Sequence, residues 1–252
     1  MRLTIFSRSS KLWCLYITHP KSFVSNFWGA VHVNARNIHF RNIRAVFNDA
    51  LADEEITHYP FRRFKLRYEK TRKRALTVEQ LRQLCTMEVE PWLERYRDCF
   101  VLILLFRGIN IIDLCHLKTA SGGVVEYIRA KTHKPYSIKV EPEAQRILDK
   151  YRGKKWLLNY MDGRKSYRDY YQTLSKALRC LGDRIGVTGL STYWARHTWA
   201  TLASYLDIPF TTIAAGLGHG GNTVTDIYID YDYSKVDRAN RQIIDWAFYG
   251  KM

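Results

Sequence analysis

The longest strictly apolar run of the chain, from Cys99 to Phe106, limits what the chain can become. A helix that crosses a bilayer needs about 20 consecutive apolar residues, so this run is too short to span a membrane. It is typical of a helix buried on all sides in a globular domain. A chain of 252 residues with 46% hydrophobic residues can build a core around such a helix without disulfides or metals.

The charge balance indicates a nucleic-acid partner. There are 40 Lys and Arg residues against 24 Asp and Glu residues, which gives a net charge of +16 at pH 7. Cationic side chains that neutralise phosphates and release their counterions are a common reason for such an excess. Composition alone leaves ribosomal proteins, nucleases, regulators and heparin binders open. Residues 1–17 lack the unbroken apolar stretch of a signal peptide, so we expect a cytoplasmic protein.

The usual signatures of a cofactor are missing from the sequence. The five cysteines are odd in number and form no CxxC pair, and the eight histidines form no HxxxH pair. There is no GxxxxGK[ST] phosphate loop either. We therefore expect neither a metal nor a nucleotide cofactor.

Hydrophobic periodicity divides the chain into two helical parts joined by a basic linker. We expect residues 1–57 to form a truncated N-terminal helical domain, 58–74 to form the linker and 75–252 to form a larger domain. Pro60 ends the preceding helix, and aromatic and basic residues alternate in the linker. Such a run is most often a solvated loop, and the alternative is a strap along DNA phosphates. The candidate phosphate contacts are Arg62, Arg63, Lys65, Arg67, Arg72 and Lys73.

The pattern of the larger domain predicts mainly helices with a small antiparallel sheet, an α+β fold. Thr77 and Gln80 form a capping box at the start of a helix. One helix is then predicted over 92–117, and two β segments over 124–140 are predicted to form a hairpin around a Lys-Pro turn. The later helices are predicted over 141–151, 166–185, 193–206, 209–217 and 236–248. The apolar face of the last helix suits packing on its own domain and packing on a neighbouring protomer equally well.

Two motifs towards the C-terminus carry the most specific signal. STYWARHTWAT contains Tyr193, Arg196 and His197, and LGHGGNTVTDIY contains His219 and, nine residues later, Tyr228. Together they resemble the tyrosine recombinase or integrase family, which has a His-x-x-Arg-His motif on a helix and then Leu-Gly-His followed by the nucleophilic tyrosine. Most relatives have histidine where this chain has Tyr193. His197 would buttress the motif from another side of its helix.

The resemblance implies a catalytic role for each matched residue. Tyr228 would attack the scissile phosphate, and Arg196 would hold the phosphate's non-bridging oxygens. His219 and Tyr193 would donate hydrogen bonds to these oxygens or orient the nucleophile. Lys131, on the predicted hairpin, would protonate the leaving 5′ oxygen.

Two of these assignments have competitors nearby in the sequence. Lys134 lies on the same hairpin as Lys131 and is also a candidate DNA contact. Tyr231 and Tyr233 follow Tyr228 closely, but their distance from the histidine does not match the family pattern. Lys131 and Tyr228 are therefore the preferred candidates.

The chain departs from the family at its first arginine motif. In LFRGINIIDLCHL the arginine position holds Asn110, and Arg107 lies three residues earlier, on the same face of the predicted helix. Arg107 is a candidate for the missing phosphate contact, because its side chain is long; an ordinary ion pair is the alternative. The stretch also resembles a variant from a branch of mobile-element integrases.

The function that the resemblance implies is site-specific strand exchange between two DNA duplexes. The family works through a 3′-phosphotyrosyl link, as tetramers on double-stranded DNA, without ATP or metal, and accessory directionality factors are expected partners. Because Asn110, Tyr193 and the short N-terminus depart from the family, a DNA-binding remnant without turnover is the alternative. A type IB topoisomerase would share the nucleophile, but the small size and the Leu-Gly-His spacing argue against it.

Overall fold

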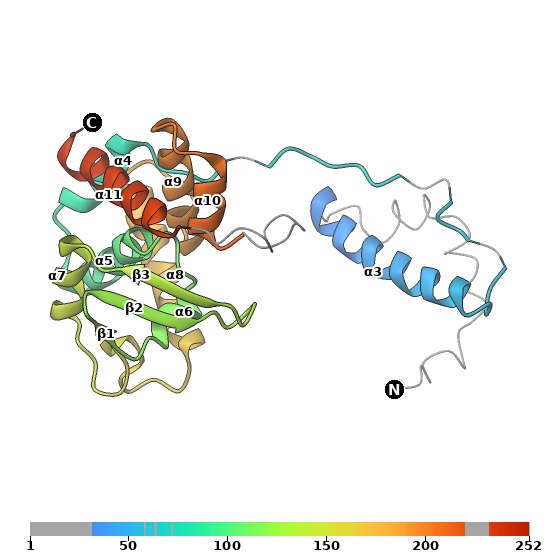
Figure 1. The fold of residues 1–252 in the computed structure, drawn as a ribbon, viewed down its shortest axis with the longest axis horizontal. Coiled ribbons are helices and arrows are strands. Elements are labelled where there is room, and N and C mark those ends of the chain that lie inside the picture. Colours follow the sequence, from blue (N-terminus) through green and yellow to red (C-terminus); the bar gives the residue numbers. More distant parts are fainter. Residues whose placement is uncertain (1–31, 58, 63–64, 72, 220–231, 252) are drawn as a thin grey trace. The chain divides into compact units, whose positions relative to one another are not determined.

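The computed structural model describes residues 32–57, 59–62, 65–71, 73–219 and 232–251. Four residues singled out in the sequence lie outside this part of the chain: Arg63, Arg72, Tyr228 and Tyr231. The chain divides into two compact units, residues 1–72 and 73–252 (Figure 1). The two units are described separately below.

The described part of the first unit contains a long helix, α3, which spans Val33–Ala52. The Phe47 ring meets the Phe61 ring edge-on, with 5.5 Å between the ring centroids. The Asn37 side-chain amide donates a hydrogen bond of 2.6 Å to the backbone carbonyl of Arg67. The described part of the predicted linker therefore lies against α3. All of its Lys and Arg side chains that the structure describes are exposed: Arg62, Lys65, Arg67 and Lys70, and, in the second unit, Lys73 and Arg74.

The second unit is built around helix α5, Pro91–Leu105, which contains most of the apolar run. Nearly all of its C-terminal half is buried, as expected for a helix surrounded by others. Four helices pack against α5, and these are α4 (Val78–Thr86), α7 (Pro142–Lys150), α8 (Tyr167–Arg184) and α9 (Thr192–Tyr205). The capping box of Thr77 and Gln80 starts α4 as the sequence predicts.

A small antiparallel sheet in the order β1-β2-β3 lies at one edge of these helices (Figure 1). Val125 of β2 pairs with Ile138 of β3, and both side chains are buried. The strands are β1 (Ala120–Ser121), β2 (Val124–Ile128) and β3 (Pro135–Lys139). The prediction of a mainly helical fold with a small antiparallel sheet is confirmed.

Helix α11, Ser234–Tyr249, packs on its own domain, against α4, α9 and α10 (Phe210–Leu217). Its Asn240 side chain is buried and joins two other helices, accepting a hydrogen bond of 2.8 Å from Trp199 and donating one of 3.0 Å to the Leu105 carbonyl. Buried polar groups that are fully paired in this way fix one arrangement of the helices. The last helix therefore packs on its own domain, which is one of the two arrangements that the sequence leaves open. A 3₁₀ turn, η1 (Asn159–Met161), completes the unit.

The single helix predicted over 92–117 is wrong. Helix α5 ends at Leu105, and a separate short helix, α6, spans Ile111–Cys115. The turn between them contains Arg107 and Gly108, with φ angles of 57° and 74°. A Cβ on Gly108 would lie 2.5 Å from the Cβ of Arg196, so glycine is required both by the backbone angle and by the close approach of α9. None of the helices in the described part of the chain combines the length and hydropathy that crossing a membrane requires.

Candidate active site

Arg196 lies at the centre of the candidate site. It comes from α9, and its Nη1 donates a hydrogen bond of 3.0 Å to the carbonyl of Gly108. Its Nη2 donates to the carbonyl of Leu217 and lies 3.2 Å from Nε2 of His219. One guanidinium therefore joins the α5–α6 turn, the end of α10 and the histidine of the Leu-Gly-His motif.

The position of His219 follows from the way α10 ends. Gly218 caps the helix in the left-handed conformation, with a φ angle of 69°, and the His219 amide donates back to the carbonyl of Ala214. The Gly218 carbonyl accepts a hydrogen bond of 3.1 Å from the Tyr136 hydroxyl of β3. This termination places the histidine beside Arg196.

Burial and two neighbouring charges favour the neutral form of the His219 ring. Burial lowers the pKa of His219, and the positive charges of Arg196 and Arg129 lower it further. The ring therefore remains unprotonated at pH values below those at which an ordinary histidine loses its proton. Because a guanidinium only donates, the hydrogen-free nitrogen of the neutral ring is Nε2, which faces Arg196, and it can accept a proton from a hydroxyl only after that contact opens.

Arg107 does not lie on a helix face beside Asn110, as the sequence predicts. It lies in the α5–α6 turn, and its side chain is only 4% exposed. One nitrogen donates to the carbonyl of Ser137 on β3, and another lies 3.7 Å from a carboxylate oxygen of Asp237 on α11. Its Nε has no hydrogen-bond partner within the part of the chain that the structure describes. The guanidinium is thus enclosed and binds the turn to the sheet and to α11.

The side chain of Asn110 is also engaged. It donates a hydrogen bond of 3.2 Å to Oδ2 of Asp113, a buried carboxylate in α6. The other oxygen of Asp113 accepts a hydrogen bond of 2.9 Å from the backbone amide of Ala130, in the β2–β3 turn. Asp113 thereby fixes the hairpin turn directly before Lys131.

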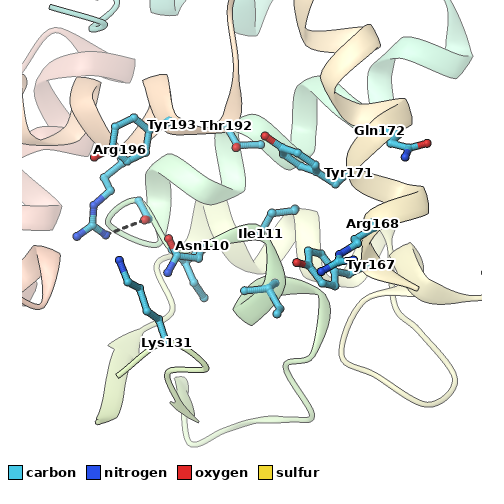
Figure 2. Close-up of a pocket in the computed structure, with 13 residues that line it drawn as sticks. Asn110, Ile111, Lys131, Tyr167, Arg168, Tyr171, Gln172, Thr192, Tyr193 and Arg196 are labelled. Atoms are coloured by element: carbon cyan, nitrogen blue, oxygen red, sulfur yellow. Dashed lines mark hydrogen bonds between the residues drawn. The ribbon is translucent and has the colours of Figure 1, made fainter. Parts of the chain in front are cut away.

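An open cleft of about 710 Å³ brings several predicted site residues together (Figure 2). At one end, the side chain of Lys131 points towards Arg196 and Asn110. Tyr193 lines the same cleft; it is exposed, and its ring meets that of His197 edge-on at 4.5 Å. The far wall comes from the start of α8 and consists of Tyr167, Arg168, Tyr171 and Gln172.

Other predicted residues lie outside this cleft. Arg107 and Tyr233 line a second pocket, of about 590 Å³, together with residues of β2 and β3. Lys134 is exposed in the hairpin turn. The sequence interpretation missed Arg129 and Asp113, although Arg129 lies only two residues before Lys131 in IRAKT, where alternation in a hairpin favours the same face. In the described part of the chain, no cluster of side chains suits a metal ion.

Among the comparisons with known proteins, only the one with solved structures finds matches, and these agree on one fold. No protein-family model and no curated protein sequence matches the chain. The integrase of mycobacterium phage Brujita is 14% identical, with a TM-score of 0.53 over 92% of this chain and 77% of that one. The Tn1549 transposon integrase, solved with circular intermediate DNA, is 19% identical, with a TM-score of 0.60 over 92% of this chain and 83% of that one.

A lambda integrase tetramer bound to a Holliday junction is 16% identical, with a TM-score of 0.61 over 84% of this chain and 64% of that one. The chain has the tyrosine recombinase fold. The motifs that resemble the recombinase family lie in this fold around one cleft: Arg196 and Tyr193 on α9, and Lys131 on the hairpin. His219, in the loop after α10, contacts Arg196.

Proposed function

We propose that the chain is a site-specific DNA recombinase that breaks and rejoins strands through a 3′-phosphotyrosyl intermediate. The observation that carries the proposal is the contact of Arg196 with His219 beside a cleft that Lys131 and Tyr193 line, in a recombinase fold. The nucleophile is Tyr228, assigned from the sequence motif.

Arg196 supplies the positive charge at the phosphate. Two carbonyls, of Gly108 and Leu217, accept hydrogen bonds from the guanidinium and orient it. A guanidinium has five N–H donors, so further donors are available for the non-bridging oxygens of a phosphate. Donors that are oriented before the reaction stabilise the charge that develops on these oxygens in the transition state.

The cleavage step then moves two protons. The Tyr228 hydroxyl oxygen attacks phosphorus, its proton passes to Nε2 of the neutral His219 ring once Arg196 has turned from that nitrogen to the phosphate, and the bond from phosphorus to the 5′ oxygen breaks. Lys131 gives a proton to the departing 5′ oxygen, which leaves as a hydroxyl. In the second step a 5′ hydroxyl of the partner strand attacks the phosphotyrosine, and both protons return. Because one phosphate ester replaces another, the exchange needs no ATP.

Double-stranded DNA is the proposed partner. The contacts outside the cleft are the exposed basic side chains Arg62, Lys65, Arg67, Lys73 and Lys134, with Arg63 and Arg72 added from the sequence. We propose a homo-tetramer on two duplexes as the active assembly, and accessory directionality factors as further partners. A protein of this kind works where DNA is present, in the cytoplasm.

Trapping of the covalent intermediate tests the proposal. The native chain and Tyr228→Phe are incubated with nicked duplexes from the flanks of the gene that encodes the chain, without metal. We expect a protein–DNA adduct that is stable on a denaturing gel, maps to Tyr228 by mass spectrometry and is absent from the variant. DNA binding without an adduct on any flank would favour the alternative, a DNA-binding remnant.

A modified leaving group tests the role of Lys131 against its competitor Lys134. A 5′-bridging phosphorothiolate leaves as a thiolate and does not need a proton donor. We expect Lys131→Ala to cleave ordinary DNA at least about 100-fold more slowly and to recover on the phosphorothiolate. Lys134→Ala is expected to weaken DNA binding with no recovery. The opposite pattern would assign the proton donor to Lys134.

A further inference from the structure

The proposed mechanism lacks a second arginine at the phosphate. The transition state carries charge on two non-bridging oxygens, and one guanidinium, that of Arg196, reaches the cleft from α9. The family position for the other arginine holds Asn110, whose amide donates to Asp113. Arg107 would have to leave both the Ser137 carbonyl and the Asp237 carboxylate to reach a phosphate.

Arg129 comes from another part of the fold. It begins the β2–β3 turn, where its backbone amide donates to the carbonyl of Lys134 and its carbonyl accepts from the amide of His133. Its guanidinium lies over the Tyr136 ring, 5.7 Å from the ring centroid, and donates a hydrogen bond of 3.3 Å to the Tyr136 hydroxyl. That hydroxyl donates to the carbonyl of Gly218, directly before His219.

The same guanidinium faces the candidate site. Arg129 lines a small cavity together with Asn110 and Arg196. After burial, the charge of Arg129 is the largest cause that lowers the pKa of Arg196, and it also lowers the pKa of His219. Among the described residues neither guanidinium forms an ion pair with a carboxylate, and two positive groups held close together in this way favour the binding of an anion between them.

We propose that Arg129 supplies the second guanidinium for a non-bridging oxygen of the scissile phosphate, in place of the arginine that is missing at Asn110. This inference rests on the proposed recombinase function. The hairpin would then carry both the phosphate clamp, Arg129, and the proton donor, Lys131. A hydrogen bond from the Ala130 amide, between these two residues, to the buried Asp113 ties the turn to α6.

The partners of Arg129 explain why it is available. Within the described residues it donates one hydrogen bond, to a neutral hydroxyl, and its side chain is partly exposed. A phosphate oxygen is a stronger acceptor than this hydroxyl, because the phosphate carries negative charge and can accept two parallel hydrogen bonds from one guanidinium. Arg107, by contrast, is enclosed and already faces a carboxylate.

A substrate without the negative charge tests the inference. Once the adduct has mapped the cleavage site, the scissile phosphate is replaced by a methylphosphonate, in which an uncharged methyl group replaces one non-bridging oxygen. We expect Arg129→Ala to form the adduct 10²- to 10³-fold more slowly than the native chain on ordinary DNA. On the methylphosphonate, its rate is expected to come within about tenfold of the native rate, while DNA affinity stays within about threefold.

Three variants serve as controls. Arg146→Ala removes an exposed arginine from α7, with the same change in net charge, and is expected to keep the native rate on both substrates. Arg129→Gln keeps a donor for Tyr136 and covers the case in which alanine loosens the hairpin. Asn110→Arg in the Arg129→Ala background restores an arginine at the family position and is expected to regain at least about tenfold.

The outcomes separate the two proposals. If the native chain forms no adduct on any substrate, the proposed function fails. If the native chain forms the adduct and Arg129→Ala forms it equally fast, the assignment of Arg129 is wrong and the function stands. If the Arg129→Ala and Arg129→Gln variants are both slow, and the methylphosphonate restores neither, Arg129 holds the hairpin in place rather than the phosphate, which also overturns the assignment.

Discussion

Two turns of the second unit, residues 106–110 between α5 and α6 and residues 129–134 between β2 and β3, each contribute an arginine next to Arg196. Arg107 is enclosed by a strand carbonyl and a carboxylate, whereas Arg129 is partly exposed and donates to a tyrosine hydroxyl. Both side chains carry the same charge in the same neighbourhood. The difference shows that the partners already present, rather than proximity, decide which arginine is available to bind a phosphate.

The largest effect is expected from the glycine that forms the first of these turns. In Gly108→Ala the new methyl group meets the Arg196 side chain at 2.5 Å, and the φ angle of +74° is strained for alanine. We expect the free energy of unfolding to fall by about 3 kcal/mol or more, from overpacking and backbone strain together. Urea denaturation measures the change.

Gly122→Ala is the matched control for this variant. Gly122 also has a positive φ angle, of +59°, but a Cβ there meets nothing within 4 Å. We expect a loss of about 1 kcal/mol, from the backbone strain alone. Equal losses in the two variants would show that the close approach of α9 to the turn is not what requires glycine at position 108.

Arg107, the enclosed arginine, is expected to contribute to the free energy of unfolding. Arg107→Ala removes the positive partner of the half-buried Asp237 and leaves a cavity, so we expect a loss of about 2 to 3 kcal/mol. In the Asp237→Asn background the loss should be smaller by about 1 kcal/mol, because the carboxylate that needs the arginine is gone. A double-mutant cycle from urea denaturation gives this coupling. Additive losses would contradict the assigned ion pair.

The sequence predicted the parts of this region that depend on local pattern. Helical periodicity and the two motifs placed Arg196 on a helix and His219 directly after one, and the structure brings the two together at 3.2 Å. The break after α5 was not predicted, because the apolar period continues through the turn. At this break Gly108 lies against Arg196, a residue far away along the chain, and a local pattern does not reveal such a contact.

Arg129 was missed for a similar reason. Its contacts run through Tyr136 to the carbonyl of Gly218, and no spacing within the hairpin reveals that link. Matching to family motifs directed attention to the neighbourhood of Asn110, where Arg107 was the nearest arginine. Tyr228 lies outside the described residues, so its role remains a prediction from the sequence.

A smaller effect is expected from the hydroxyl that holds Arg129. Tyr136→Phe removes the hydrogen bonds to Arg129 and to the Gly218 carbonyl but keeps the ring stacked on Tyr127, with 5.4 Å between the ring centroids. We expect a loss of about 1 kcal/mol in the free energy of unfolding, measured by urea denaturation. Adduct formation is expected to slow less than in Arg129→Ala. A variant as slow as Arg129→Ala would make Tyr136 essential for placing the guanidinium.

The smallest and most selective effect concerns the pKa of His219. Burial, Arg196 and Arg129 lower it, and Arg107 is not among the causes. Loss of the positive charge in Arg129→Ala should therefore raise the pKa of His219 towards 6.5, the ordinary value, while Arg107→Ala leaves it unchanged. Histidine ring resonances followed by NMR against pH measure both values, with His219→Gln to assign the signal.

The direction in which pH changes the rate of adduct formation follows from the same positive charge, that of Arg129. If neutral His219 takes the proton of the nucleophile, adduct formation rises with pH through the pKa of His219 and then levels off. In Arg129→Ala this rise should move to higher pH, so the variant loses most activity on the acidic side. A methylphosphonate removes the negative charge of the phosphate but does not restore the positive charge beside the His219 ring. It should therefore restore the rate of Arg129→Ala and leave the shifted rise in place. A rise that returns to the native pH on the methylphosphonate would mean that Arg129 acts on the histidine only through the bound phosphate.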